Sequence, residues 1–430
     1  MRTARTFTST LVAAGLAAGL FLTGCSSDSD DTTAVGDADA GASASVGIAA
    51  APGQPDPGKY RTTPRPAFGE AGDENMGRIV EGQRMAEFVT LPGEIDPELT
   101  VLASMSTYVI KNASASANVL GEQETKVAEK YNMVNGFTTS RYTPGNQTQN
   151  KSIVHAVLRF PDAESAKNAA KEMPVAGLNP TYNGEVLPSL AKRTTAIDIL
   201  PNTMVTVRIT PDEDGKVSTE AFTAHGDYVL YDWAESLQSE QNWQATTIAK
   251  AVSLQGPLID KFPATPVADL PKLPIDVDGV LVYTVPPADG KRTTNEQAVW
   301  GPHGAAHFQT NGLQNLQDFT DTGTTRIASD ASSVYLVDNA KGAVELFNRF
   351  MTQFTGPQVD PTDDPWTKID GPAGVADAQC LTSTTISGTQ IYYCAVQRGN
   401  YLGETGGIDE ADIKQRITAQ SMILDAAAKQ

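Results

Sequence analysis

Two halves of the sequence repeat one succession of patterns, and this repetition restricts the possible fold more than any other feature. Each half reads as two strand-like runs, a helix, further strand-like runs and a long final helix. The helix that follows the first two strand-like runs begins at Pro161-Asp162 in one half and at Asp338-Asn339 in the other. The corresponding segments are 136–142 with 323–327, 153–160 with 333–337, and the final helices at about 235–261 and about 409–429. The repetition predicts a duplicated unit.

Helices that follow blocks of hairpin strands indicate an antiparallel sheet with helices packed on one face. We therefore expect an α+β fold of two tandem related units, at residues 59–262 and 275–430, joined by a Pro-rich linker at 263–274. Two unrelated domains with an ordinary order of elements are the alternative. Within the first unit, Asp96-Pro97 predicts the start of a helix that continues to about Lys111.

The beginning of the chain has the pattern of an export signal. Arg2 and Arg5 precede an apolar run from Leu11 to Leu22 that is about 12 residues long, whereas a bilayer core requires roughly 20. Leu22-Thr23-Gly24-Cys25 is similar to a bacterial lipobox. We therefore expect residues 1–24 to be a lipoprotein signal peptide and Cys25 to be lipidated, with several acyl chains giving stable attachment. An ordinary signal followed by an incidental cysteine is the alternative.

The segment 25–58 contains almost no large apolar residues. It cannot bury enough surface to offset its ordering entropy, so its composition predicts a disordered tether that reaches roughly 30 Å. The whole chain carries a formal net charge of −19, and loss of the two leader arginines makes the mature chain about two units more negative. This acidity argues against binding to nucleic acid or to anionic lipid. It fits an exported protein held at the extracytoplasmic face of the cell membrane.

The two remaining cysteines, Cys380 and Cys394, are predicted to form a disulfide. Strand-like runs rich in Thr, Ile and Tyr surround them, and Ile386-Ser387-Gly388 lies between the runs. A three-residue loop at 386–388 places Thr385 opposite Thr389 and Cys380 opposite Cys394, with Gly388 in the left-handed position that such a turn favours. An exported compartment permits the bond. Two buried free thiols are the alternative.

Three segments carry a resemblance to a known family. The runs Tyr60 to Pro66, Glu81 to Ala86 and Gly304 to Gln309, with the lipobox and the acidic tether, resemble a family of uncharacterised lipoproteins from mycolate-containing actinobacteria. The resemblance implies kinship over most of the mature chain and implies no activity. In fold alone, the inferred order of elements is also similar to the extracytoplasmic sensor domains of some actinobacterial kinases.

Other candidate sites have weak patterns. His303 and His307 have the i, i+4 spacing of a helical metal pair, but Gly301-Pro302 and Gly304 disfavour a helix, so His307 is expected beside Phe308 on a half-buried strand. The run Asp212 to Gly215 fails the EF-hand pattern at both ends and is interpreted as a hairpin turn. Ser189 to Lys192 matches Ser-x-x-Lys without its companion motifs.

These patterns predict no catalytic, metal or cofactor site. Our first hypothesis is a non-enzymatic, lipid-anchored lipoprotein that binds a hydrophobic or envelope-derived ligand between the units or in a sheet-and-helix pocket of one unit. The alternative is a scaffold that binds another envelope protein. A hydrolase that uses two carboxylates is a third possibility and would need two acidic groups in a deep cleft. The aromatic residues are interpreted as core, with a lipid or glycan pocket as the alternative.

Overall fold

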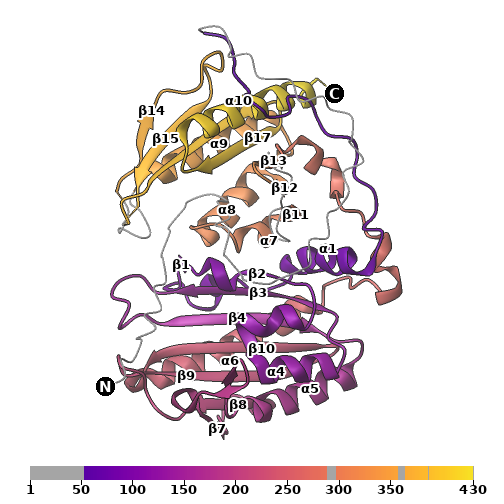
Figure 1. The fold of residues 1–430 in the computed structure, drawn as a ribbon, viewed down its shortest axis with the longest axis vertical. Helices are drawn as coiled ribbons and strands as arrows, with labels where there is room; N and C mark the ends of the chain where they lie inside the picture. The colour runs from indigo at the N-terminus through magenta and orange to yellow at the C-terminus, as the bar shows by residue number, and fades with distance from the viewer. Residues whose placement is uncertain (1–52, 288–296, 357–363, 386, 430) are drawn as a thin grey trace.

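The structure is a computed structural model that describes residues 53–287, 297–356, 364–385 and 387–429. Within these ranges the chain forms two antiparallel sheets, one in each half, and a two-stranded ribbon (Figure 1). Helices lie before, between and after the strands of each sheet. The α+β class and the two tandem units are therefore confirmed.

The first unit contains an eight-stranded sheet in the order β1-β3-β4-β10-β9-β8-β7, with β2 also paired to β3. Its strands are β1 (Val101–Leu102), β2 (Tyr108–Ile110), β3 (Asn135–Tyr142), β4 (Ser152–Arg159), β7 (Lys192–Thr195), β8 (Thr203–Arg208), β9 (Lys216–His225) and β10 (Tyr228–Leu237), with the separate ribbon β5 (Thr181–Tyr182) and β6 (Glu185–Val186). Its helices are α1 (Glu74–Ala86), α2 (Pro92–Ile95), α3 (Ala117–Leu120), α4 (Glu122–Lys130), α5 (Ala163–Ala176) and α6 (Gln241–Ile259).

The second unit contains a seven-stranded sheet in the order β11-β12-β13-β17-β16-β15-β14. Its strands are β11 (Ala298–Trp300), β12 (Thr324–Ser329), β13 (Ser333–Val337), β14 (Thr367–Ile369), β15 (Gln379–Thr384), β16 (Gln390–Arg398) and β17 (Tyr401–Gly407). Its helices are α7 (Pro302–Ala306), α8 (Gly312–Thr322), α9 (Ala340–Thr355) and α10 (Glu410–Ala427).

The two units share one topology. The order β3-β4-β10-β9-β8-β7 of the first sheet corresponds strand by strand to β12-β13-β17-β16-β15-β14 of the second. In each unit a helix follows the second of these strands, and a long helix follows the last strand in the sequence. Equivalent caps begin the equivalent helices, because Asp162 accepts a hydrogen bond from the Ser165 N–H and Asn339 accepts one from the Gly342 N–H. The predicted duplication of the order of elements is confirmed.

Helices cover both faces of each sheet, which corrects the expectation of one helical face. Successive strand residues point to opposite faces. In the first unit, Phe222 packs in the cluster that contains α5, whereas its neighbour Ala221 packs against Ile248 of α6. In the second unit, Tyr393 packs with α9 and Cys394 packs with α10. Both faces of the central strands are therefore apolar, and the sheets need a helix on each side.

The predicted helix from Asp96 to Lys111 is wrong. Residues 101–110 instead form β1, a short 3₁₀ turn and β2, and both strands pair with β3. The Asp96 carboxylate does not cap a long helix, since it accepts hydrogen bonds from the Glu98 N–H and from the Trp243 indole N–H. The β-branched and aromatic residues of Tyr108–Ile110 favour a strand once a partner strand is available.

The two units share a continuous hydrophobic core. Phe137 on β3 of the first unit contacts Trp300 and Phe308 of the second, with ring centroids 6.4 and 5.9 Å apart. The same buried cluster includes Met85 of α1 and extends through Tyr335 to the helix α9. Side chains of both units therefore pack together in this cluster.

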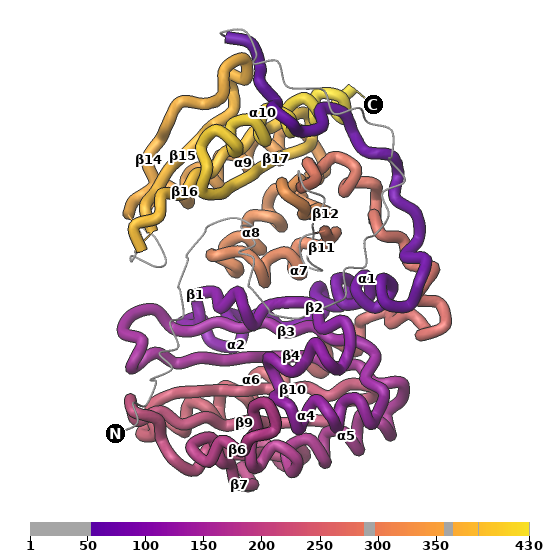
Figure 2. Tube along the Cα trace, viewed as in Figure 1, coloured from indigo at the N-terminus to yellow at the C-terminus, as the bar shows by residue number. Residues whose placement is uncertain are grey.

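The N-terminal residues of the described chain lie against the second unit, although they precede the first unit in sequence. We call residues 53–66 the strap. The Tyr60 hydroxyl donates to Asp412 of α10 at 2.6 Å, and the buried Arg65 forms an ion pair with Asp330 at 2.9 Å. The strap continues beside α10 towards α1 (Figure 2). It therefore ties the end of the second unit to the beginning of the first.

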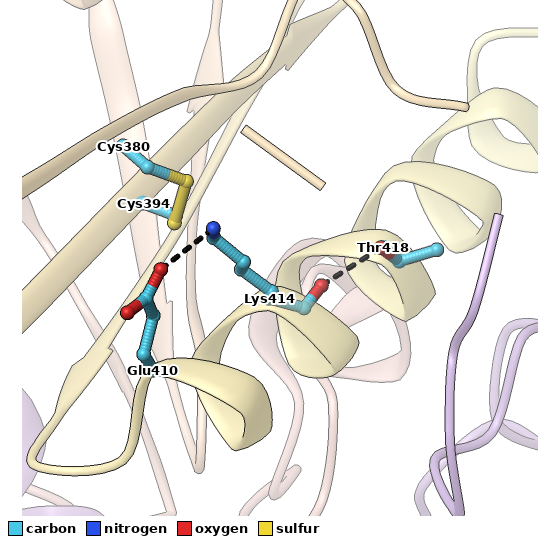
Figure 3. Close-up of a disulfide and its surroundings, with 5 residues drawn as sticks. All are labelled: Cys380, Cys394, Glu410, Lys414 and Thr418. Atoms are coloured by element: carbon cyan, nitrogen blue, oxygen red, sulfur yellow. Dashed lines mark hydrogen bonds and ion pairs between the residues drawn. A yellow bond between two sulfur atoms is a disulfide. The ribbon is translucent and has the colours of Figure 1, made fainter. Parts of the chain in front are cut away.

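The disulfide between Cys380 and Cys394 is present, and its register is the predicted one. Cys380 pairs directly with Cys394 across β15 and β16, with Cα atoms 4.2 Å apart. The Thr385 N–H donates to the Thr389 carbonyl, and Gly388 has a φ of +81°. The bond is buried and faces the first turns of α10, near the Glu410–Lys414 ion pair (Figure 3). It cross-links β15 to β16 and packs against α10.

We expect the disulfide to contribute about 3 kcal/mol to the free energy of unfolding, because it closes a loop of 14 residues in the unfolded chain. Urea unfolding with and without dithiothreitol measures this contribution. The Cys380→Ala/Cys394→Ala variant is the control, since its unfolding midpoint should not respond to the reductant. An equal midpoint for the oxidised and reduced wild-type protein would contradict the expectation.

Candidate functional site

A pocket of about 480 Å³ opens in the second unit between α9 and the outer strands of the sheet. The helix packs against β13, β16 and β17, so the pocket lies towards β14 and β15. Its wall includes Val344, Phe347 and Asn348 of α9, with Lys368 of β14 and Gln379 of β15. The loop 370–378, which joins these two strands, contributes the remaining side. The pocket therefore depends on a helix that covers only part of its sheet.

Polar side chains dominate the pocket lining. Asn348, Lys368 and Asp370 are exposed and Gln379 is half-buried. Within the described part of the chain, these four side chains make no hydrogen bond to another residue, so their donors and acceptors face solvent. Asp377, also in the lining, is held by Arg398, whose Nη2 donates to it at 3.0 Å. Phe347, which is only 8% exposed, contributes apolar surface to the lining.

A second group of polar side chains is buried between the units. Arg141 of β3 donates to the carbonyl oxygens of Thr100, Ala306, Gln309 and Thr310. Three of these carbonyls are at or just beyond the end of α7, where helix carbonyls lack partners and attract cations. Burial lowers the pKa of Arg141 to about 10, and the guanidinium therefore remains charged at neutral pH. Arg141 thus fixes α7 of the second unit on β3 of the first.

His303 lies in α7, and His307 directly follows it. The His307 Nε2 is 3.1 and 3.0 Å from the carbonyl oxygens of Ala86 and Val89, at and just beyond the end of α1. Burial and the neighbouring positive charges lower the pKa of His307 well below its ordinary value, so the ring is neutral and its Nε2 donates. Burial would lower the pKa of His303, but the carboxylate of Glu94 at 3.2 Å raises it instead. The two rings are 5.6 Å apart.

A buried network surrounds His155 on β4. Its Nδ1 is 2.7 Å from Asp232 on β10, and its Nε2 is 2.8 Å from the Gln255 Oε1 on α6. The Gln255 orientation is set because its Nε2 donates to the Phe88 carbonyl. Burial opposes charge on His155, but Asp232 and the hydrogen bonds raise its pKa. Gln255 occupies the position that a nucleophile would take in a hydrolytic triad, so this network is structural.

Glu404 on β17 is fully buried in the shared core. The hydroxyls of Tyr335 and Tyr393 each donate to its carboxyl group at 2.6 Å. Desolvation raises the pKa of Glu404 to about 7, and the two tyrosine hydrogen bonds oppose this shift. The chain of contacts continues from Tyr335 to Gln309, in the segment that Arg141 holds. A titratable carboxyl is thus linked to the interface between the units.

Comparison with protein families places the chain in one of them. The N-terminal model of the family described as "Domain of unknown function (DUF7373)" matches residues 68–275, and its C-terminal model matches residues 280–427. The chain belongs to the DUF7373 family. The two matched segments correspond to the two sheets.

No curated protein matches this DUF7373 chain. Among solved structures, it is similar to the extracellular domain of PknH from Mycobacterium tuberculosis, with 12% sequence identity and a TM-score of 0.29. The match covers 42% of this chain and 97% of that domain.

In this DUF7373 chain, the structure brings together few of the candidate site residues that the sequence analysis named. Cys25 lies outside the described residues. His303 and His307 are neighbours on and directly after α7, so the strand expected for His307 is wrong. No group of three His, Cys, Asp or Glu residues suited to a metal ion occurs among the described residues. The run Asp212 to Gly215 is a turn, as predicted, in which the Gly215 N–H donates to the Asp212 carbonyl.

Ser189 and Lys192 form no catalytic pair in this DUF7373 chain. Lys192 forms ion pairs with Glu124 at 3.1 Å and Glu220 at 2.7 Å. Ser189 is exposed in a short 3₁₀ turn. The two acidic groups meet in a buried cluster rather than in the pocket, and burial raises the pKa of Glu124.

Sequence reasoning did not find the pocket or the roles of Arg141 and Glu404. The pocket residues come from four separate segments and share no motif. A charged residue inside a strand pattern is one available signal, because both Arg141 and Glu404 interrupt otherwise buried strands. In the part of the chain that the structure describes, no helix has the length and apolar character to cross a membrane.

The raised pKa of Glu404 predicts a stability that falls as the pH rises. Between the ordinary glutamate pKa of 4.5 and the raised value of about 7, the unfolded chain loses a proton that the folded chain keeps. The free energy of unfolding should therefore decrease across this range by about 3 kcal/mol, with no further change from this group above it. Glu404→Gln keeps the shape and can accept from one tyrosine while donating to the other.

Urea unfolding of the wild type and of Glu404→Gln at pH 5, 6, 7 and 8 tests this expectation. The variant should lose most of the difference between pH 5 and pH 8, and it should be the more stable protein at pH 8. Parallel pH curves for the two proteins would show that Glu404 does not carry the dependence.

Proposed function

We propose that the protein is a non-enzymatic binding lipoprotein, anchored by a lipid at Cys25 to the extracytoplasmic face of an actinobacterial cell membrane. The observation that carries the binding role is the pocket beside α9, where four polar side chains have no partner within the described chain. Side chains of both units pack together where the units meet, so this sheet-and-helix pocket is the better candidate for the ligand site.

The anchor is supported by the sequence around Cys25 and is consistent with the buried disulfide. The apolar run and Leu22-Thr23-Gly24-Cys25 have the order that a lipoprotein signal requires. A disulfide is typical of exported proteins and uncommon in the cytosol. The resemblance to lipoproteins of mycolate-containing actinobacteria belongs to the same proposal.

Labelling cells with radioactive palmitate tests the anchor. The wild-type chain should incorporate the label and sediment with membranes, whereas Cys25→Ala should incorporate none, because its side chain lacks the acceptor thiol. Cys380→Ala/Cys394→Ala is the matched control and should label like the wild type. Equal labelling of the wild type and Cys25→Ala would refute the anchor.

Native mass spectrometry of the protein solubilised from its host membrane tests the binding role. We expect a mass excess beyond that of the acylated chain, because a ligand occupies the pocket. Asn348→Ala/Gln379→Ala should lose most of this excess, since the variant removes two of the unpartnered polar side chains. A wild-type mass without any excess, together with no binding in a panel of envelope lipids and glycans, would count against the role.

A scaffold that binds an envelope protein is the second candidate. The observation in its favour is a concentration of exposed large apolar side chains in one part of the first unit. They are Val175, Tyr182, Val186, Leu190, Ile199, Met204 and Ile209. This segment includes the edge strand β7 of the sheet. In the experiment above, a mass excess of protein size that survives Asn348→Ala/Gln379→Ala would favour this candidate.

A further inference from the structure

We propose that the pocket beside α9 binds a neutral, hydroxyl-rich group, namely a sugar, and that the membrane presents this sugar as a lipid headgroup. The inference rests on the proposed binding function and adds the chemical class of the ligand. Three observations carry it: the types of polar groups in the lining, the balance of charge, and the position of the strap.

The polar groups of the pocket supply hydrogen-bond donors and acceptors side by side. The amides of Asn348 and Gln379 each offer an NH₂ donor and a carbonyl acceptor, Lys368 only donates, and Asp370 only accepts. A sugar hydroxyl both donates and accepts, so a lining of this kind suits a ligand with several neighbouring hydroxyls. A hydrocarbon chain would leave these polar groups without partners, at a cost for each buried one.

The charges of the lining leave no positive excess. Lys368 stands beside Asp370 and Asp377 in the lining, and Arg398 pairs with both Asp377 and Asp425, the latter at 2.7 Å. The pocket therefore offers no net positive charge to an anionic phosphate.

The apolar part of the lining suits the other side of a sugar ring. The apolar residues of the lining are the buried Phe347, the exposed Val344 and the half-buried Ile369. A pyranose presents C–H groups on one face and hydroxyls around its rim. A lining that combines apolar and polar side chains matches this arrangement, because C–H groups pack on apolar surface while hydroxyls form hydrogen bonds.

The strap passes the wall of this pocket. Pro55 packs directly on Gly374, where an added Cβ atom would lie 2.5 Å from the proline ring. Gly374 belongs to the loop that provides Gly371, Ala376 and Asp377 to the lining, and it has a φ of +78°. Only glycine permits both this backbone conformation and the close approach of the strap.

The position of the strap brings the pocket close to the proposed anchor. Only the 27 residues 26–52 separate Cys25 from Gly53. The coil predicted from their composition reaches roughly 30 Å. The strap joins the folded body beside the pocket wall, so a tether of the reach expected from the sequence holds the pocket near the membrane surface. A headgroup that projects from the membrane is therefore the source that the geometry favours.

Vesicle flotation tests the proposal with the full mature chain from residue 25, carrying Cys25→Ser so that no acyl chain contributes. The probes are phosphatidylcholine vesicles that contain diglucosyl-, digalactosyl- or dimannosyl-diacylglycerol. Vesicles with phosphatidylglycerol and the three free disaccharide–glycerol headgroups complete the set. We expect binding to at least one type of sugar-bearing vesicle and competition by the matching free headgroup.

Two variants test whether binding occurs in the pocket or elsewhere on the surface. Asn348→Ala/Gln379→Ala should weaken binding at least tenfold without shifting the unfolding midpoint, because Asn348 is exposed and Gln379 is half-buried. Lys171→Ala is the matched control. Lys171 is exposed, and it lies as many residues after the N-cap of α5 as Asn348 lies after the N-cap of α9. It should bind like the wild type.

Each outcome of these experiments either supports or excludes a sugar headgroup as the ligand. Binding of a free headgroup but not of its vesicle would keep the sugar and overturn the membrane source. Binding to phosphatidylglycerol vesicles alone, no binding to any sugar probe, or equal binding by the double variant would overturn the sugar. If native mass spectrometry then still showed a pocket-dependent ligand, the binding function would stand and only this inference would fall.

Discussion

The burial of Phe137 against Trp300 and Phe308 joins the two units of this DUF7373 chain into one body. Each sheet alone would leave an apolar face exposed at this position, and the hydrophobic effect favours covering it with the other unit. The cluster continues without interruption from β3 through α1 to α9. The relative position of the units is therefore fixed by packing rather than by the length or stiffness of the segment between them.

Polar groups inside this core give the packing its specificity. Arg141 requires several carbonyl acceptors at once, and only one placement of α7 supplies them. His307 similarly requires the end of α1. A displaced arrangement would leave a buried guanidinium or imidazole without partners, which is costly in a medium of low dielectric. Apolar contacts thus hold the units together, and these residues select one orientation among the alternatives.

The order of the elements and the disulfide could be predicted because their signals are local. Asp162 and Asn339 mark helix starts within a few residues, and Gly388 fixes the hairpin register that pairs the cysteines. The wrong predictions concern segments whose secondary structure depends on contacts with residues far away in the sequence. The helix α7 forms despite Gly304, with Pro302 in its first turn and with Arg141, far away in sequence, bound to carbonyls at and beyond its end. Similarly, residues 101–110 become strands because β3 pairs with them. The pocket could not be predicted at all, since it follows from where α9 crosses its sheet.

The strap has a consequence for how the chain matures. Tyr60 and Arg65 are among the earliest residues of the folded body to leave the ribosome, yet their contacts, Asp412 and Asp330, belong to the second unit. Asp412 lies near the end of the chain, so the docking of Tyr60 must wait until translation is almost complete. The first sheet does not use these contacts, so it can assemble before the strap docks. Docking of the strap therefore requires both ends of the chain, and a chain truncated before Asp412 would lack the hydrogen-bond partner of Tyr60.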